Sequence, residues 1–441
     1  MTLFTSISFS IAAFLFVLGV MIFIHEFGHY AVAKLLGIRV EVFSVGFGRR
    51  LIGFQRGDTD YRISLLPLGG YVKMSGENYD DDLSGDSGEF MSHPKLHRFA
   101  VAVAGPLMNI GLAIILLTVT FMFGIPAAKH LRQPAVIGSI SDGSPAEQAG
   151  LQIQDRIVAI DGDPTPTWRE AELQISISPN QELMFSIERD GKVINQSVTT
   201  SVAEGFEIGT IGASPFIPFI VADVGPESPA AQAGLQPNDE ILQVSIGDQT
   251  SRGFNDSAEL INSSEGLPVQ VEVRRGSQVF ETTISPEQME GQWRIGTTIQ
   301  VMELEQYGFF GALSRSMERN YRLTTLTFEV VGRIFTGRTS LKAMSGPIEI
   351  ARFSGMAAAL GGTQLLNFMA LISLQLGIFN LMPIPILDGG VIALLGIEGL
   401  IRRDLSLRLK ERIFQVGFVF LILLMGVVIF NDLAKNLPIL N

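Results

Sequence analysis

The sequence contains no cysteine, and charged residues are scarce in it. Because none of the 441 residues is Cys, no disulfide supports the fold, and a zinc site would need His and carboxylate ligands. Only 17% of the residues are charged and 47% are hydrophobic, which is too apolar for a purely soluble enzyme. The net charge of −12 argues against nucleic acid as a partner.

Charge is missing altogether from residues 1–24. A secretory signal peptide would begin with basic residues and end at a cleavage site. This apolar run leads instead into the motif His25-Glu26-Phe27-Gly28-His29. We therefore expect the run to stay in the protein as a membrane span.

The motif His25-Glu26-x-x-His29 has the spacing of a zinc site. At about 3.6 residues per turn, the two histidines share one helical face and Glu26 lies beside them as a base. The alternative is a cluster of side chains hydrogen-bonded to one another inside a helical bundle. Each ionisable group in a membrane helix costs about 2.5–3.5 kcal/mol, which favours the functional interpretation.

Four segments are long enough to span a bilayer, which needs about 20 apolar residues. They are residues 3–24, 99–123, 365–387 and 413–430. The third could instead be a buried core helix, although its length and lack of charge favour the membrane. Basic residues are concentrated in 34–98 and 402–412, so these loops are predicted to be cytoplasmic and both termini external. Basic residues between 315 and 352 conflict with this topology, but long translocated segments largely escape the charge rule.

Catalytic zinc needs a third protein ligand and an open position. Asp388 is the strongest candidate, since it lies at the cytoplasmic end of the third span as the histidines do in the first. The first and third spans run parallel, so the three side chains can meet at one depth. A turn or helix-stop role for Asp388 is the alternative. His93, His97 and His130 are weaker candidates, better explained as loop or surface residues.

Two stretches near the motif are candidates for substrate binding. In residues 61–74, an alternating pattern of β-favouring residues surrounds a Gly pair and predicts a hairpin. An exposed strand edge at Gly70, Tyr71 and Val72 could pair with an extended substrate. A simple cytoplasmic β-loop is the alternative, followed by a mobile acidic loop at 77–89. Asn380, Pro383 and Pro385 predict a broken helix that faces protein or water. Asn380 could bind substrate or stabilise its own broken helix.

The long segment between the second and third spans contains a repeat. Ser144-Pro145-Ala146 recurs 84 residues later as Ser228-Pro229-Ala230, and further matches keep the same offset. Two copies of one small, mostly β domain are therefore expected. The pattern resembles the bacterial PDZ domain, which takes peptides by strand addition. The alternative is a spacer or a steric cover. Residues 308–355 then mix apolar and basic side chains, which is typical of surface-lying amphipathic helices.

The predicted fold is a multi-domain membrane protein. It has a four-span α-helical core, a membrane-associated β-hairpin loop and two tandem, mostly-β, PDZ-like periplasmic domains. The predicted boundaries are 1–36, 98–124, 362–390 and 413–433 for the spans, 37–97 for the β-loop, 127–213 and 214–302 for the repeats, 303–360 for the surface helices and 391–412 for a cytoplasmic loop.

These features together resemble the site-2 protease family of intramembrane metalloproteases, in particular its bacterial members. The resemblance covers nearly the whole chain. It depends on the H-E-x-x-H motif, the repeats, and the motifs Gly70-Tyr71-Val72-Lys73-Met74, Gly105-Pro106-x-x-Asn109, Ser345-Gly346-Pro347 and Asn380-x-x-Pro383-x-Pro385-x-Leu387-Asp388-Gly389. Close relatives usually have His after Leu-Asp-Gly-Gly, whereas this chain has Val391, which puts a contact made there in doubt.

The resemblance implies an inner-membrane enzyme in which His25, His29 and Asp388 hold Zn²⁺. It also implies single-span membrane proteins, already trimmed on the periplasmic side, as substrates. These include an anti-sigma factor of envelope-stress signalling, with signal-peptide remnants as a second class. The competing hypothesis is a non-catalytic membrane adaptor that binds peptide ligands through its PDZ-like pair and has a silent metal site. Glu26 argues against the adaptor, because a structural site has no use for a base.

Overall fold

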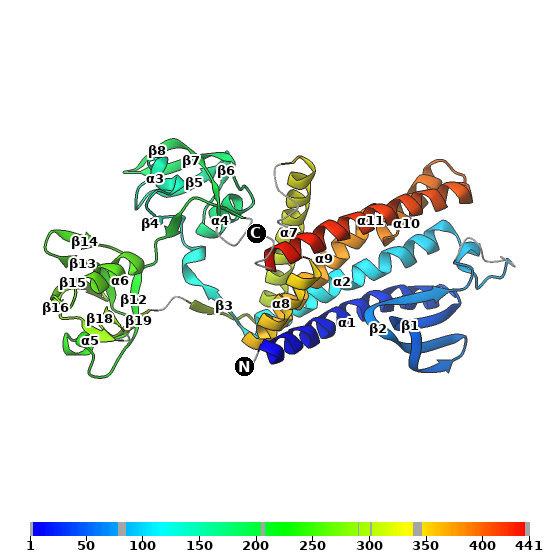
Figure 1. Ribbon diagram of the computed structural model, residues 1–441, viewed down its shortest axis with the longest axis horizontal. Coiled ribbons are helices and arrows are strands. Elements are labelled where there is room, and N and C mark those ends of the chain that lie inside the picture. The colour runs from blue at the N-terminus through cyan, green and yellow to red at the C-terminus, as the bar shows by residue number, and fades with distance from the viewer. Residues whose placement is uncertain are drawn as a thin grey trace. The chain divides into compact units, whose positions relative to one another are not determined.

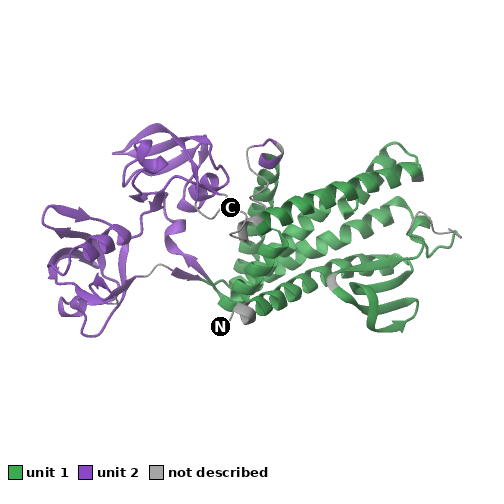
Figure 2. Cartoon of the chain, viewed as in Figure 1, with its two compact units in different colours: residues 1–125, 305–332, 344–441 green, residues 126–304, 333–343 purple. Residues whose placement is uncertain are grey.

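A computed structural model describes residues 3–77, 85–203, 208–289, 291–299, 302–337 and 346–436. The chain forms two compact units: residues 1–125, 305–332 and 344–441 make the first, and residues 126–304 and 333–343 make the second (Figure 2). Most of the predicted mobile loop at 77–89 lies outside the described residues, and so does Ser345 of the Ser-Gly-Pro motif.

Four helices of the first unit are long and apolar enough to cross a membrane (Figure 1). They are α1 (Leu3–Leu35), α2 (Lys95–Phe123), α9 (Gly362–Leu381) and α11 (Leu407–Asn436). α2 packs against both α1 and α9, and the core between them includes Val17, Met21 and Met369. The apolar side chains of α11 are largely exposed, as expected of a helix that faces lipid.

The third predicted span ends earlier than expected. α9 stops at Leu381, and a separate helix, α10 (Asp388–Leu400), begins after a turn. Pro383 and Pro385 explain the interruption, because proline has no backbone N–H for a helical hydrogen bond. The segment 391–412, expected to be a loop, is therefore helical over its first ten residues.

The β-loop is larger than predicted. β1 (Val40–Arg56) and β2 (Thr59–Met74) form an antiparallel pair that turns at Gly57, where φ is +60°. The predicted reversal of the chain around Gly69-Gly70 is present within β2, although residues 42–45 lie between its two arms instead of the arms pairing with each other. Residues 42–45 of β1 pair on one side with 60–63 and on the other with 70–73. In the described part of the chain, residues 70–74 therefore form an edge of this folded sheet.

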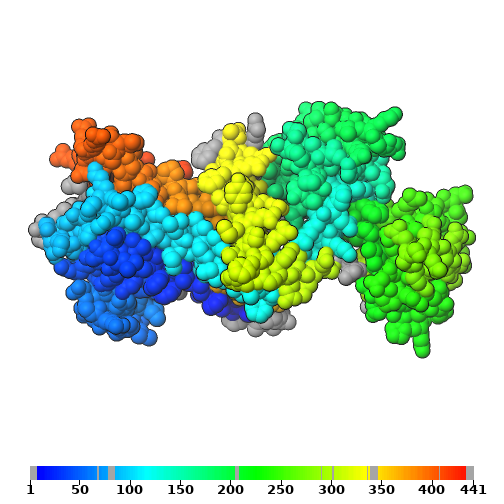
Figure 3. Space-filling model, turned by 180° about the vertical axis from the view of Figure 1, so that it is seen from behind, coloured from blue at the N-terminus to red at the C-terminus, as the bar shows by residue number. Residues whose placement is uncertain are grey.

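Two further helices complete the first unit. α7 (Phe309–Phe335) lies against α2, where the Ser316 hydroxyl donates to the Ile114 carbonyl at 2.8 Å (yellow beside cyan in Figure 3). Its opposite face is charged, with Arg315 paired to Glu318 at 2.9 Å, so the helix is amphipathic as predicted. α8 (Pro347–Leu360) packs along α1.

Asp432 of α11 caps the N-terminus of α8. Its buried carboxylate accepts hydrogen bonds from the backbone N–H groups of Gly346 at 2.9 Å, Ile348 at 3.0 Å and Glu349 at 3.3 Å. These groups have no acceptor within their own helix. At the other end of α11, Lys410 forms a buried ion pair with Glu398 of α10 at 2.7 Å. Polar contacts thus attach both ends of an otherwise exposed helix.

The second unit contains two β-rich halves, each with its own apolar core. The first half has a sheet in the order β6-β5-β7-β8, and the second has a sheet in the order β16-β15-β13-β12-β19 with β14 beside β13. The strands are β3 (Ile125–Ala128), β4 (Ile137–Ile140), β5 (Arg156–Ile160), β6 (Asp163–Pro164), β7 (Glu182–Arg189), β8 (Lys192–Thr199), β9 (Ser201–Val202), β10 (Gly209–Thr210), β11 (Ala213–Pro215), β12 (Phe219–Val224), β13 (Glu240–Ile246), β14 (Gln249–Ser251), β15 (Val269–Arg275), β16 (Gln278–Ile284), β17 (Glu287–Met289), β18 (Gln292–Arg294), β19 (Thr297–Ile299) and β20 (Met302–Glu305). The helices are α3 (Pro145–Gln148), α4 (Trp168–Ser176), α5 (Pro229–Gln232) and α6 (Phe254–Ser263). Short 3-10 turns occur at Phe90–Ser92 and Lys129–Arg132.

The repeated motif has the same local structure in both halves. Ser144 caps α3 and Ser228 caps α5, each by accepting from the backbone N–H three residues later. A buried aspartate then pairs with an arginine that closes a later strand: Asp155 with Arg189 at 2.6 Å, and Asp239 with Arg275 at 2.8 Å. Burial alone would raise the pKa of Asp239, but hydrogen bonds from Arg275 and the Gln236 backbone N–H hold it below its ordinary value.

Replacing Asp432 by Ala should loosen the start of α8. Loss of a capping side chain costs about 0.5–2 kcal/mol, so amide exchange at residues 346–349 should accelerate roughly 2- to 30-fold. Hydrogen–deuterium exchange of the full chain in detergent measures this. Phe430→Leu, at an exposed position of the same helix, is the control and should leave exchange there unchanged. Equal exchange in Asp432→Ala and the control would contradict the capping role.

Candidate metal centre

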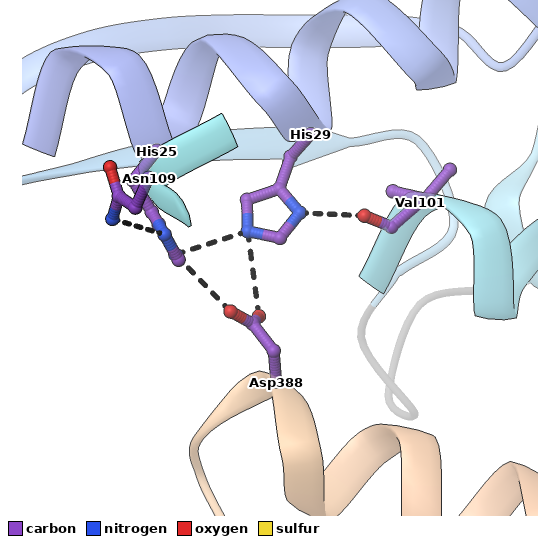
Figure 4. A network of polar contacts seen from close by, with 5 residues as sticks. All are labelled: His25, His29, Val101, Asn109 and Asp388. Atoms are coloured by element: carbon purple, nitrogen blue, oxygen red, sulfur yellow. Dashed lines mark hydrogen bonds and ion pairs between the residues drawn. The ribbon is translucent and has the colours of Figure 1, made fainter. Parts of the chain in front are cut away.

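His25, His29 and Asp388 meet at one point of the first unit. The two histidine Nε2 atoms are 3.3 Å apart. Asp388 reaches both: Oδ2 is 3.2 Å from His25 Nε2, and Oδ1 is 3.4 Å from His29 Nε2 (Figure 4). In the described ranges of the chain, this is the one group of three or more His and acidic residues whose ligand atoms lie close enough to share a metal ion.

The turn between α9 and α10 fixes Asp388. Gly389 and Gly390 follow it, and a Cβ there would lie 2.1 Å from the Met382 carbonyl oxygen and 2.5 Å from that of Ile384, respectively. Only glycine therefore lets the turn fold so closely onto the start of α10. Ile386 has φ of +84°, which is unfavourable for a β-branched residue and shows how tightly this turn is constrained.

α1 and α2 approach each other very closely beside the histidines. A Cβ on Gly28 of α1 would lie 2.6 Å from the Ala104 carbonyl oxygen of α2. A Cβ on Gly105 of α2 would lie 2.3 Å from His29 Nε2 and 2.9 Å from His25 Cε1. Because Gly28 and Gly105 have no side chains, the backbone of α2 lies directly beside the site.

The sequence did not predict the α2 contacts of the two imidazole rings. His29 Nδ1 is 2.8 Å from the Val101 carbonyl oxygen, and His25 Nδ1 is 3.2 Å from the Asn109 side-chain amide. The motif Gly105-Pro106-x-x-Asn109 marked this helix as part of the resemblance but assigned no role to its residues. The signal for a role was the spacing of four between 105 and 109, which equals that of the two histidines.

Glu26 lies at the edge of the folded β-sheet. The backbone N–H of Val72 donates a hydrogen bond to its carboxylate. A Cβ on Gly70 would lie 3.1 Å from Glu26 Cγ. The structure thus brings Gly70 and Val72, two of the three predicted strand residues, to the predicted base. The Tyr71 ring instead stacks on Phe47, with centroids 6.1 Å apart.

The remaining candidates have different positions. Asn380 is in the last turn of α9, half-buried, and its side chain has no hydrogen-bond partner in the described ranges. Pro383 and Pro385 are in the turn that leads to Asp388, and Pro385 borders Gly417 of α11. His93 and His97 face each other with their Nδ1 atoms 3.1 Å apart and are not part of the cluster, and neither is His130.

The donor set suits a catalytic metal. Two imidazoles and a carboxylate are a ligand set of zinc hydrolases. Asp388 Oδ2 is buried and lacks a hydrogen bond in the described structure, so a cation would satisfy it. The three side chains are 12%, 11% and 22% exposed, which leaves a narrow approach for a substrate group.

Comparison with known proteins agrees with this geometry. The family described as Peptidase family M50 matches residues 13–424. "Protease RseP" of Yersinia pestis is 34% identical over 460 residues, covering 98% of this chain and 99% of the relative. "Regulator of sigma-E protease RseP" of Escherichia coli K12 is 33% identical over 456 residues, covering 98% and 99%. "Regulator of sigma E protease" of Haemophilus influenzae is 32% identical over 454 residues, covering 98% and 100%.

These matches confirm the resemblance that the motifs suggested, because they extend over almost the entire chain and include both the histidine motif and Asp388. M50 peptidases are zinc-dependent proteases, and the apolar helices agree with a multi-pass inner-membrane protein. The chain therefore belongs to peptidase family M50 and is a zinc metalloprotease.

Proposed function

We propose that this protease cuts the membrane segments of single-span proteins, with His25, His29 and Asp388 as the zinc ligands and Glu26 as the base. One observation carries the proposal: the three ligand atoms converge on a helix whose composition is that of a membrane span. A proteolytic site placed there acts on peptide bonds that water does not otherwise reach.

The ligand assignment follows from the donor set. Zinc in a catalytic site takes three protein ligands and keeps one position open. When bound, zinc supplies a Lewis acid for the scissile carbonyl and lowers the pKa of water to about 7. The α2 contacts at Nδ1 leave both Nε2 atoms free to face the ion, which supports assigning them as the donors.

Glu26 is the general base that takes the proton of the attacking water. It follows His25 in the chain, so its carboxylate lies beside the ligands rather than among them. The Val72 N–H holds this carboxylate, which fixes its direction. Glu26 accepts a proton from the attacking water and transfers it to the leaving amine.

The strand edge at residues 70–74 supports a binding role for Gly70, Tyr71 and Val72. A helical substrate has its carbonyl groups hydrogen-bonded, so it must unwind before attack. This strand edge, beyond which no further strand lies in the described ranges, offers the unwound segment new backbone partners next to Glu26. Asn380, whose amide is free in the described ranges, would bind the substrate backbone from the other side of the turn formed by Pro383 and Pro385.

The topology and substrates are part of the same proposal. With four spans, and with both termini and the second unit in the periplasm, the metal centre would lie toward the cytoplasmic side of the inner membrane. Five relatives carry the name regulator of sigma-E protease, which supports an anti-sigma factor as one substrate. Signal-peptide remnants are a second class that such a site would accept.

The second unit would act as a pair of PDZ-like domains. The duplicated caps and buried Asp–Arg pairs support two copies of one domain. We propose that the pair excludes substrates with bulky periplasmic domains, with peptide binding as the competing role. A purely adaptor function has no observation in its favour, because the chain belongs to a peptidase family and keeps Glu26.

Glu26→Gln and Asp388→Ala should separate catalysis from metal binding. Glu26→Gln should retain zinc and lower cleavage of a single-span substrate by about 10²- to 10⁴-fold, because only the base is lost. Asp388→Ala should lose zinc as well as activity. Purified variants are compared by elemental analysis and by cleavage with and without a chelator. Full activity in the first variant would refute the base, and unchanged zinc in the second would exclude the ligand.

Gly105→Ala should weaken zinc binding although residue 105 is not a ligand. Its new methyl group would displace the His29 ring, so zinc affinity should fall at least about tenfold, as for other groups that orient metal ligands. Gly111→Ala is the matched control, because a Cβ there meets nothing within 4 Å. Zinc retention during dialysis against graded chelator measures both. Equal retention in the two variants would argue against a critical helix approach.

A substrate with a large folded periplasmic domain should resist cleavage until that domain is removed. Removing residues 127–300 from the protease should abolish this discrimination while zinc stays bound. A panel of single-span substrates that differ only in external size provides the test. If the intact protease cleaves all of them equally, the size-exclusion role is wrong.

A further inference from the structure

Both imidazoles of the metal centre are in contact with α2 on the side away from Asp388. His29 Nδ1 lies 2.8 Å from the Val101 carbonyl oxygen. His25 Nδ1 lies 3.2 Å from Nδ2 of Asn109 (Figure 4). Each ring therefore has the Asp388 carboxylate beside Nε2 and a polar group of α2 beside Nδ1.

α2 is built to make these two contacts together. Val101, Gly105 and Asn109 follow one another at intervals of four and share one helical face. The same interval separates His25 and His29 on α1. Gly105 lies between the two contact residues, where a side chain would strike both rings. On this face of α2, the Val101 carbonyl contacts one histidine and the Asn109 side chain contacts the other. Gly105, between them, has no side chain and leaves room for both rings.

Asn109 is fixed in place. It is fully buried, and its backbone carbonyl accepts a hydrogen bond from the Ser373 hydroxyl of α9 at 2.7 Å. Its Oδ1 atom is buried and has no partner in the described part of the chain. A buried amide with one atom unpaired and the other beside a metal-ligand histidine calls for an explanation.

The chemistry of a metal-bound histidine supplies one. An imidazole that binds a metal through Nε2 is neutral and has its proton on Nδ1, so Nδ1 must donate a hydrogen bond. The Val101 carbonyl is the acceptor that His29 needs. An amide oxygen and nitrogen have nearly the same shape, and which one faces a neighbour is decided by the hydrogen bonds available. Either orientation leaves one amide atom of Asn109 unpaired, so the contact at His25 decides between them.

We propose that Asn109 is a positioning residue whose amide oxygen accepts the His25 Nδ1–H and holds that ring in the orientation and tautomer that bind zinc. This rests on the proposed zinc centre. Asn109 and the Val101 carbonyl then have the same function on the two rings, one from a side chain and one from the backbone. α2 supplies no ligand, yet it sets the direction of both nitrogen donors.

Asn109→Asp and Asn109→Leu test the proposal through zinc affinity. Asp keeps the acceptor oxygen and removes the amide donors, whereas Leu has similar size and no acceptor. Zinc affinity of the purified full-length protein is measured by metal analysis after dialysis against graded chelator. Asn109→Leu should bind zinc about 10- to 100-fold more weakly, and Asn109→Asp should remain within about threefold of the natural protein.

Thr118→Val is the control on the same helix, because in the described part of the chain the Thr118 hydroxyl bonds only to the Ile114 carbonyl of its own helix, at 2.7 Å. If Asn109→Leu does not give folded protein by size exclusion, Asn109→Ser takes its place, since its short hydroxyl cannot reach the ring. Two results would overturn the proposal. One is an equal loss of zinc affinity in Asn109→Asp and Asn109→Leu, and the other is an unchanged zinc affinity in Asn109→Leu or Asn109→Ser. Failure of the natural protein to bind zinc would instead contradict the metal centre, which distinguishes the two.

Discussion

The close crossing of α1 and α2 is the constraint on which the rest of the site depends. Gly28 and Gly105 remove the side chains that would keep the two helices apart. Only at that distance can a backbone carbonyl and a buried amide of α2 reach the imidazoles of α1. Helix association inside a bilayer gains little from the hydrophobic effect, so close packing at small residues has to supply it. The same packing here also orients the reactive groups.

Within the first unit, several polar side chains form contacts that connect one helix to another. The Ser373 hydroxyl ties α9 to α2, the Asp432 carboxylate ties α11 to α8, and Lys410 ties α11 to α10. In lipid, an unpaired polar group costs roughly several kcal/mol of free energy, so each of these contacts is hard to break once formed. The metal centre therefore lies in a frame whose helices are connected in register by specific bonds. Asn109 takes part in both the helix contacts and the site. Its backbone carbonyl accepts from Ser373 of α9, and its side chain contacts His25.

Periodicity and charge were enough to predict much of this arrangement. The apolar runs predicted helices over the correct regions, and the spacing of His25 and His29, with the parallel course of the first and third spans, predicted that Asp388 would meet them. The pairing within the β-loop and the end of α9 were less predictable. The sequence does not reveal that residues 42–45 lie between the two arms of the reversal around Gly69-Gly70, and the position where a proline breaks a helix depends on what the freed backbone packs against.

The α2 contacts lay beyond prediction for a different reason. Val101 acts through its carbonyl oxygen, which every residue possesses, so no side-chain pattern marks it. Gly105 acts through an absent atom, and its importance becomes visible only when the neighbouring helix is in place. Single-sequence reasoning identifies residues by their reactive groups, and it therefore predicted the meeting of His25, His29 and Asp388 but not the helix that contacts them.

The order of the three cluster residues along the chain has a consequence for synthesis. Asp388 follows His29 by 359 residues. At about 5–20 residues per second, a ribosome needs on the order of half a minute to cover that interval. The three-residue cluster, and with it the proposed metal centre, can therefore form only after Asp388 has been made.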